Sequence, residues 1–170
     1  KQDDYQFLCN FINKAAQAGC QTFIIHARKA WLKGLNPKQN RTVPPLDYER
    51  VYRLKRDFPH LEIIINGGIE TIDEVKQHLQ QIDGVMIGRK AYHDPLFLAQ
   101  LEAEIFHNTP LPQQSLLQKM SAYIEAMQQQ GVSHRNVTRH MLGLFHGQTG
   151  AKNWRKRLTA NPLQVLKEIV

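Results

Sequence analysis

The stretch LEIIINGG at residues 61–68 decides the fold class of this chain. From Ile63 to Ile65 three β-branched residues follow one another without polar interruption, and the run ends in two glycines, which predicts a short strand. An apolar run that does not alternate with polar residues is typical of a strand covered on both faces. Such strands occur in parallel sheets with crossover helices, so we expect an α/β fold.

Two further apolar runs, at residues 22–25 and 85–87, predict strands on either side of this one. Asp47 is the expected N-cap of one connecting helix, and Thr71 with Glu74 matches a capping box for the next. The predicted helices cover residues 4–18, 47–58 and 71–81, the first with Leu8, Phe11, Ile12 and Ala15 on its apolar face. Three strands cannot close a TIM barrel, so a barrel needs five further strands before residue 1.

Only helical periodicity remains after Pro110 and Pro112. The expected helices contain Leu116–Met127, then Val137, Met141 and Leu144 behind a Ser133 cap, then Trp154 and Leu158, and finally Pro162–Val170. The fold class is therefore predicted as α/β plus α. Residues 1–110 are expected to form the C-terminal three β/α units of an incomplete TIM barrel, and residues 111–170 a small helical bundle.

Positive charge is concentrated in the second part of the chain. Of the net charge of +7, residues 115–170 contribute +6, with eight Lys or Arg against two Glu, while residues 1–114 are nearly balanced. This asymmetry indicates a scaffold or catalytic domain joined to a polyanion-binding one. A basic but merely solvated helical tail has the same charge, and charge alone does not separate these readings.

Two of the strands end in glycine. Asn66-Gly67-Gly68 follows one and Gly88-Arg89 follows the next, 21 residues later. Glycine leaves backbone N–H groups accessible, an arginine suits bidentate phosphate binding, and helix N-termini follow both endings. A lone Gly-Gly is more often a tight turn, but two such endings on consecutive strands favour a phosphate site, since TIM barrels hold phosphate after their last strands.

Other residues point away from metal or membrane chemistry. His134, His140 and His146 recur every six residues, which places them on different helix faces, so no metal site is expected. Cys9 and Cys20 form no paired-cysteine motif, and no apolar run approaches the ~18 residues of a membrane span. We expect a soluble cytoplasmic protein. His26, at a strand end, is either a core histidine or part of the site.

Several motifs extend beyond generic α/β patterning. HARKAWL at residues 26–32 is followed by GLNPKQNR at 34–41, PPLDY at 44–48, INGGI at 65–69 and DGVMIGR at 83–89. MLGLF at 141–145 continues the match. In these motifs, and over essentially its whole length, the chain resembles the tRNA-dihydrouridine synthases, of the DusA type.

The resemblance implies a flavin enzyme that takes hydride from NADPH onto FMN and reduces D-loop uridine in tRNA to 5,6-dihydrouridine. It also implies that His26 contacts the flavin and the uracil pocket. Residues that would hold the FMN phosphate are Asn66, Gly67, Gly68, Gly88 and Arg89. Residues that would contact tRNA are Lys38, Arg41, Lys152 and Arg155, with Arg41 near the target base.

One departure from the family pattern concerns catalysis. The family's catalytic cysteine, in a Gly-Cys-Pro segment, and its flavin-contacting lysine belong to the part before residue 1. Cys20 precedes a strand and is not its counterpart. We therefore expect the isolated chain to bind FMN poorly and to be inactive.

Two other functions remain open on these residues. Another FMN- or sugar-phosphate-binding barrel enzyme would share the phosphate site, and a non-catalytic RNA-binding module would use the basic helices but not the glycine endings. We also expect the fragment to self-associate through its exposed sheet edge, at the strand beginning at Thr22.

Overall fold

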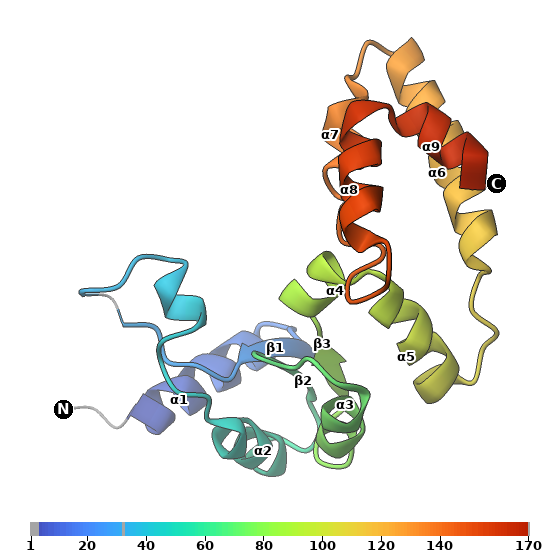
Figure 1. Ribbon diagram of the computed structural model, residues 1–170. Coiled ribbons are helices and arrows are strands. Elements are labelled where there is room, and N and C mark those ends of the chain that lie inside the picture. The colour runs from blue at the N-terminus through green and yellow to red at the C-terminus, as the bar shows by residue number, and fades with distance from the viewer. Residues whose placement is uncertain (1–3, 32, 170) are drawn as a thin grey trace. The chain divides into compact units, whose positions relative to one another are not determined.

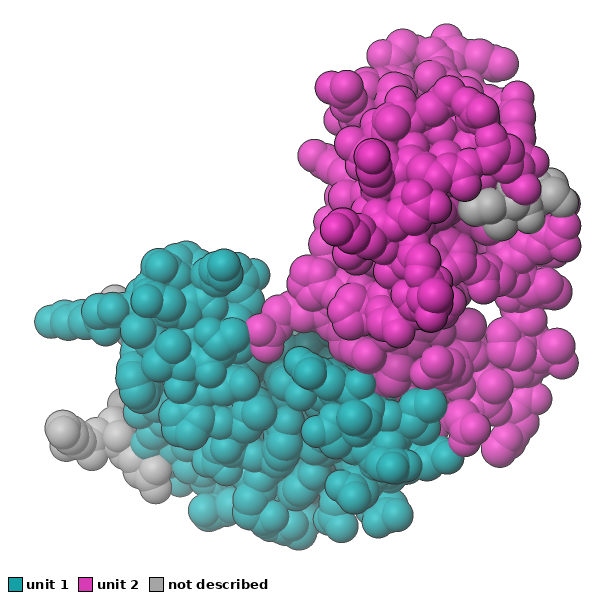
Figure 2. All heavy atoms as spheres, in the orientation of Figure 1, with its two compact units in different colours: residues 1–88 teal, residues 89–170 magenta. Residues whose placement is uncertain are grey.

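The computed structural model describes residues 4–31 and 33–169, which form two compact units, 1–88 and 89–170 (Figure 2). Leu32 of the HARKAWL motif and Val170, the predicted end of the last helix, lie outside the described residues. The first unit contains α1 (Asp4–Gln17), β1 (Thr22–His26), the 3-10 helix η1 (Gln39–Arg41), α2 (Tyr48–Asp57), β2 (Glu62–Asn66), α3 (Ile72–Leu79) and β3 (Gly84–Met86) (Figure 1).

The three strands form one parallel sheet in the order β1-β2-β3, as the sequence predicts. Ile24 pairs with Ile64, and His26 pairs with Asn66, which in turn pairs with Met86. Since all three strands run in the same direction, their carboxyl ends meet at one edge of the sheet. His26, Asn66 and Met86 therefore stand in one row across that edge.

The two faces of the sheet differ, and the prediction that both are covered is wrong for the described residues. Alternate residues such as Phe23, Ile63 and Ile65 are buried, and helices α2 and α3 pack against β2 and β3. On the other face Ile24 is 55% exposed and Met86 is 45% exposed. Continuous apolar runs hide this difference, because both faces carry apolar residues whether or not another layer covers them.

Local capping signals place α2 and α3 as expected. The side chain of Asp47 accepts a hydrogen bond from Arg50 N, and Thr71 and Glu74 form a reciprocal capping box. Val51 and Leu54 of α2 are buried, as is Val75 of α3. Burying these apolar faces holds both helices against the sheet.

The predicted apolar face of α1 is partly wrong. Tyr5 and Ile12 are buried, whereas Phe11 is 60% exposed. The Tyr5 hydroxyl donates to Asp57 Oδ2 over 2.6 Å, and the Arg53 guanidinium lies 4.0 Å from the centre of the Tyr5 ring. These contacts with α2 set the rotation of α1 about its axis, and Phe11 is turned away from the core.

The second unit is helical. Its apolar core consists of Leu117, Ile124, Met141, Leu144, Trp154, Leu158, Val165 and Leu166. Its helices are α4 (Arg89–His93), α5 (Leu96–Phe106), α6 (Gln113–Gln129), α7 (His134–Thr138), α8 (Ala151–Ala160) and α9 (Pro162–Ile169). The division between the units falls after Gly88, since α4 and α5 join the helical unit, while the predicted functional boundary lies at residue 110.

One predicted helix is much shorter than expected. Met141 and Leu144 are buried but lie beyond α7, which ends at Thr138, and the Ser133 side chain makes no cap hydrogen bond. The Met141 carbonyl accepts from the Trp154 indole N–H over 3.1 Å. A Cβ on Gly143 would lie 2.2 Å from the His93 carbonyl oxygen. This close contact and the indole hydrogen bond fix a non-helical path that sequence periodicity does not reveal.

Candidate functional site

The carboxyl ends of the strands bring three predicted site residues together. His26 and Asn66 lie on the open face of the sheet, because they share the alternation of Ile24 and Ile64. Backbone and side-chain hydrogen bonds fix this edge: Ala27 N donates to Asn66 O over 2.7 Å, and Asn66 Nδ2 donates to Met86 O over 3.0 Å. Asn66 thus ties the end of β2 to the end of β3, and Gly67 follows it directly.

Gly67 and Gly68 require glycine for two separate reasons. Their φ angles of +131° and +72° lie in the region that other residues rarely adopt. A Cβ on Gly67 would lie 3.1 Å from the His26 ring, and one on Gly68 would lie 2.7 Å from Leu46 Cδ1. His26 therefore lies directly beside Gly67, and its exposed side chain is not that of a core histidine, while its role in the site stays a prediction.

The N-terminus of α3 is partly occupied by a carboxylate of the chain itself. The Glu74 carboxylate accepts from the backbone N–H groups of Glu70 and Thr71, both over 2.9 Å. Hydrogen bonds, first that from the Glu70 N–H, keep the pKa of Glu74 below its usual value, so this carboxylate is charged at neutral pH. The backbone N–H groups of Glu70 and Thr71 are therefore already paired within the chain, and a contribution of this helix end to anion binding stays a prediction.

Gly88 and Arg89 follow β3 directly in the chain. A Cβ on Gly88 would have no heavy atom within 4 Å, so its surroundings, unlike those of Gly67, leave room for a side chain. Arg89 is the first residue of α4 and belongs to the second unit. No contact among the described residues tests whether Gly88 and Arg89 bind phosphate, and this role stays a prediction.

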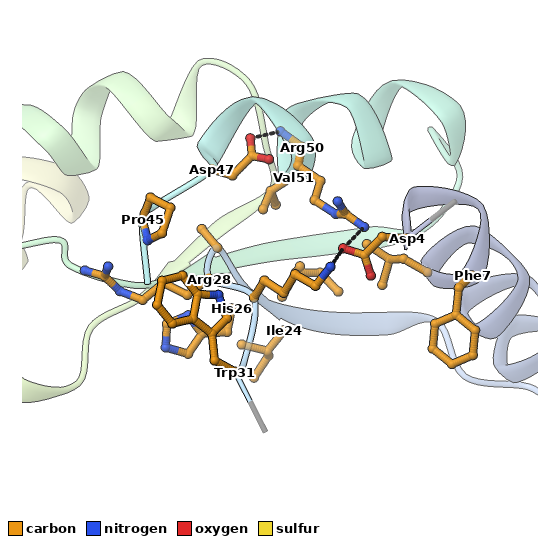
Figure 3. A pocket seen from close by; sticks show the side chains of 14 residues that line it. Asp4, Phe7, Ile24, His26, Arg28, Trp31, Pro45, Asp47, Arg50 and Val51 are labelled. Carbon is orange, nitrogen blue, oxygen red and sulfur yellow. Dashed lines mark hydrogen bonds and ion pairs between the residues drawn. The ribbon is translucent and has the colours of Figure 1, made fainter. Parts of the chain in front are cut away.

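A pocket of about 460 Å³ lies at the carboxyl end of β1 (Figure 3). His26, Arg28 and Trp31 line it from the strand and the segment that follows, and Asp4 and Arg50 line it from α1 and α2. Asp4 also pairs with Lys29 over 3.0 Å and with Arg50 over 3.3 Å. The hydrogen bond from Lys29 is the main reason why the pKa of Asp4 is lowered. This pocket combines aromatic and apolar walls with charged groups.

The loop that carries Lys38 and Arg41 is ordered by an asparagine that sequence reasoning missed. Asn40 Oδ1 accepts from Trp31 N over 2.7 Å, and its Nδ2 donates to Trp31 O over 3.0 Å. Lys38 and Arg41 are both exposed at the two ends of η1. Asparagine is common in turns, so its residue type alone does not predict that Asn40 orders the loop. The only sequence signal was its position between two segments rich in glycine or proline.

Arg28 closes the same loop from the strand side. Its guanidinium donates to the Pro44 carbonyl and, over 3.4 Å, to the Thr42 carbonyl. Asp47 N donates to Ala27 O over 2.8 Å, which brings the start of α2 to the end of β1. Arg28 thereby positions the segment that leads from η1 to α2.

Lys152 and Arg155 lie on the exposed side of α8, opposite the buried Trp154 and Leu158. Within the described part of the chain neither has an acidic partner. Arg157, by contrast, pairs with Glu168, and Lys167 pairs with Glu125 over 3.4 Å. Among the described residues the structure thus distinguishes Arg157 and Lys167, which have acidic partners, from Lys152 and Arg155, which have none.

The motifs that form this site are shared with known proteins. The sequence model described as "Dihydrouridine synthase (Dus)" matches residues 1–169. The chain belongs to the dihydrouridine synthase family. This membership agrees with the resemblance carried by the HARKAWL and INGGI motifs, and the parallel sheet with its helices is consistent with part of the barrel that the family implies.

Individual members of the Dus family are similar over nearly the whole chain. A "tRNA-dihydrouridine(20/20a) synthase" of Pasteurella multocida is 55% identical over 161 residues, which cover 94% of this chain and 49% of that protein. The proteins of the same name from Escherichia coli K12 and Haemophilus ducreyi are 55% and 54% identical, over 94% of this chain and 47% and 50% of theirs. The chain spans about half the length of these relatives.

Membrane-spanning helices and metal clusters do not occur among residues 4–31 and 33–169. No helix there combines the length and apolar character needed to cross a membrane. No group of three or more His, Cys, Asp or Glu side chains in this part of the chain has a metal-binding arrangement.

Proposed function

We propose that this chain is the C-terminal part of an FMN-dependent tRNA-dihydrouridine synthase of the cytoplasm, which uses NADPH to reduce D-loop uridine in tRNA to 5,6-dihydrouridine. One observation carries the proposal: the glycine pair at the end of β2, in backbone conformations that favour glycine, lies against His26. Membership of the dihydrouridine synthase family and the names of the relatives support it.

The residues present suit the phosphate and ring of a flavin. Phosphate would be held by backbone N–H groups of the glycine pair and by Arg89, with Gly88 permitting close approach. Asn66, whose Nδ2 donates to Met86 O, would hold the phosphate together with these residues. His26 would contact the ring system and the uracil. When bound, FMN supplies the hydride chemistry, whereas the residues of this chain bind and orient the flavin and the uracil and shield them from water.

The test of this function is reconstitution. The full-length protein, purified with FMN and supplied with NADPH and unmodified tRNA, should form dihydrouridine and oxidise NADPH in equal amounts. The 170-residue chain alone should form none, since the cysteine that protonates the base is not among its residues. NADPH oxidation that is independent of tRNA would favour another flavin barrel enzyme. Binding of tRNA without flavin would favour an RNA-binding module.

Binding of tRNA is proposed to involve Lys38, Arg41, Lys152 and Arg155. Each phosphate contact releases counterions, so the slope of log affinity against log salt should fall by roughly 0.7–0.9 per contact removed. Changing Lys152 and Arg155 together to Ala should flatten the slope by up to about two, with flavin content unchanged.

The matched control lies on the same helix. Arg157→Ala removes a cation that already pairs with Glu168, so it should alter the salt slope much less. Equal slopes for the double variant and the parent would show that the exposed side of α8 is a solvated surface. Arg41→Ala should lower turnover more than affinity, since its proposed place is near the reacting base.

The isolated chain is also proposed to self-associate through β1. In the described sheet β1 is an edge strand, Ile24 is 55% exposed, and Phe7 and Phe11 of α1 are each 60% exposed. Unpaired strand edges beside apolar surface favour association. Sedimentation should show dimers or larger species, and Ile24→Lys should shift them to monomer. A monomeric wild-type profile would contradict the proposal.

A further inference from the structure

The carbonyl of Gly67 is held by a side chain from another element, helix α2. The Tyr48 hydroxyl donates to Gly67 O over 2.8 Å. A trans peptide group is planar, and its C=O and N–H point in opposite directions. A hydrogen bond on the Gly67 carbonyl therefore also sets the direction of the Gly68 N–H, which points away from the tyrosine.

This control matters because the loop consists of two glycines. Glycine has more conformational freedom than any other residue, so Gly67 and Gly68 do not by themselves keep their φ angles of +131° and +72°. A nest of backbone N–H groups binds an anion well only if those groups already point toward it. Tyr48 supplies a restraint from 19 residues away in the chain.

Tyr48 is itself firmly placed. It is the first residue of α2, beside the Asp47 cap, and Asp47 N is bound to Ala27 O at the end of β1. Its ring meets the His78 ring edge-on, with centroids 4.5 Å apart. His78 is buried on α3, and its Nδ1 lies 2.6 Å from the Tyr52 hydroxyl. The tyrosine is therefore anchored to both helices that flank the glycine loop.

Protonation keeps this hydroxyl a donor. Burial, with the nearby Glu74 carboxylate, raises the pKa of Tyr48, so the phenol stays protonated at neutral pH. Burial lowers the pKa of His78, so its imidazole is neutral there. A neutral imidazole contacts the Tyr48 ring without placing a charge beside the Gly67 carbonyl.

We propose that Tyr48 is a positioning residue for phosphate binding: it orients the Gly67–Gly68 peptide so that its N–H faces the phosphate of FMN. The proposal rests on the proposed function, since it takes the glycine pair to be the phosphate cradle. Tyr48, the last residue of the PPLDY motif, would thus contribute to phosphate binding without touching phosphate or flavin itself.

The experiment compares FMN with riboflavin, which has the same ring system but no phosphate, as ligands of the full-length protein. Tyr48→Phe keeps the ring on His78 and removes only the hydroxyl. It should weaken FMN binding about three- to tenfold, the effect of one lost hydrogen bond, and leave riboflavin binding unchanged. Flavin fluorescence quenching gives both affinities.

Tyr52→Phe is the matched control. It removes a tyrosine hydroxyl from the same helix, but one that meets His78 rather than Gly67. It should leave the ratio of FMN to riboflavin affinity unchanged, even where it lowers the melting temperature. An unchanged ratio in Tyr48→Phe, or an equal loss in both tyrosine variants, would overturn the proposal.

A third variant separates this proposal from the proposed function. Gly67→Ala places a Cβ against His26 and Leu46, so it should abolish most of the preference for FMN over riboflavin. If Gly67→Ala keeps that preference, the cradle is elsewhere and the proposed site is wrong. If Gly67→Ala loses it while Tyr48→Phe keeps it, the cradle stands and only the role of Tyr48 fails.

Discussion

The amino ends of β2 and β3 are joined by a charged pair, whereas the carboxyl ends of the strands carry a glycine loop and a pocket. Asp83 Oδ2 accepts from Ile63 N and from Lys55 Nζ, both over 2.8 Å. Lys55 Nζ also donates to Leu61 O over 2.9 Å. At the opposite edge, two glycines with positive φ follow β2, and a pocket of about 460 Å³ lies at the end of β1.

The difference indicates separate roles for the two ends of the strands. Internal hydrogen bonds and an ion pair at the amino end stabilise the fold, because they satisfy backbone groups of neighbouring segments. Ordering glycine in a fixed backbone conformation costs conformational entropy, and at the carboxyl end of β2 two glycines in succession are held in this way. Parallel α/β barrels generally place stability and function at these opposite ends.

The largest effect should come from replacing a glycine at the carboxyl end. Gly68→Ala combines a φ of +72° with a Cβ 2.7 Å from Leu46 Cδ1, so it should cost about 1–3 kcal/mol of unfolding free energy. It should also lower FMN affinity of the full-length protein more than about tenfold, measured by flavin fluorescence.

Its control lies at the other end of the sheet. Gly19, just before β1, has a φ of +103°, and a Cβ there would have no heavy atom within 4 Å. Gly19→Ala should therefore cost stability through backbone strain alone, without changing flavin affinity. If Gly19→Ala and Gly68→Ala lowered FMN affinity equally, the two ends of the sheet would not differ in flavin binding.

Breaking the amino-end network should have the converse result. Asp83→Asn weakens the contact with Lys55 and removes a charged acceptor from Ile63 N, which should cost about 1 kcal/mol, given that both side chains are partly exposed. Urea denaturation should show a lower midpoint with FMN affinity unchanged. If Asp83→Asn lost FMN affinity at unchanged stability, the amino ends of the strands would not have a purely structural role.

The same network predicts a pH dependence. Burial alone would raise the pKa of Asp83, but the Ile63 N–H and Lys55 outweigh it, and the folded pKa lies below the unfolded one. The stabilisation is therefore complete above the unfolded pKa, near ~4, and is lost as pH falls through the folded pKa. The stability difference between wild type and Asp83→Asn should shrink over this acid range. A difference that grows on acidification would refute this account.

The smallest effect on stability is expected at Gly88. Its Cβ would meet nothing within 4 Å, so Gly88→Ala should change the unfolding free energy by less than about 0.5 kcal/mol. FMN affinity should nevertheless fall severalfold if a phosphate approaches this backbone. If Gly88→Ala binds FMN with wild-type affinity, no phosphate approaches this backbone and Gly88 is not part of the phosphate site.

Short-range patterns predicted much of the first unit. The strands, α2 and α3 lie within one or two residues of their predicted bounds, and the Asp47 cap and the Thr71–Glu74 capping box are both present. Each of these signals depends on residues close together in the chain. Glycine endings indicated a candidate site for the same reason, since backbone freedom is a property of the residue itself.

Long-range contacts account for the features that sequence reasoning missed. The rotation of α1 depends on Tyr5 meeting Asp57, and the end of α7 depends on Trp154 meeting the Met141 carbonyl. The capping box of α3 was visible in the sequence, but the further hydrogen bond from Glu70 N to Glu74 was not.

The sequence by itself determined the parallel α/β pattern, the glycine loop at the end of β2 and the excess of basic residues in the helical part. Tertiary structure alone decided which face of the sheet is open, which cations have acidic partners and which side chain holds the Gly67 carbonyl. The reason is physical: periodicity and capping act between neighbours in the chain, whereas the bond from Tyr48 to Gly67 exists only once α2 has packed beside β2.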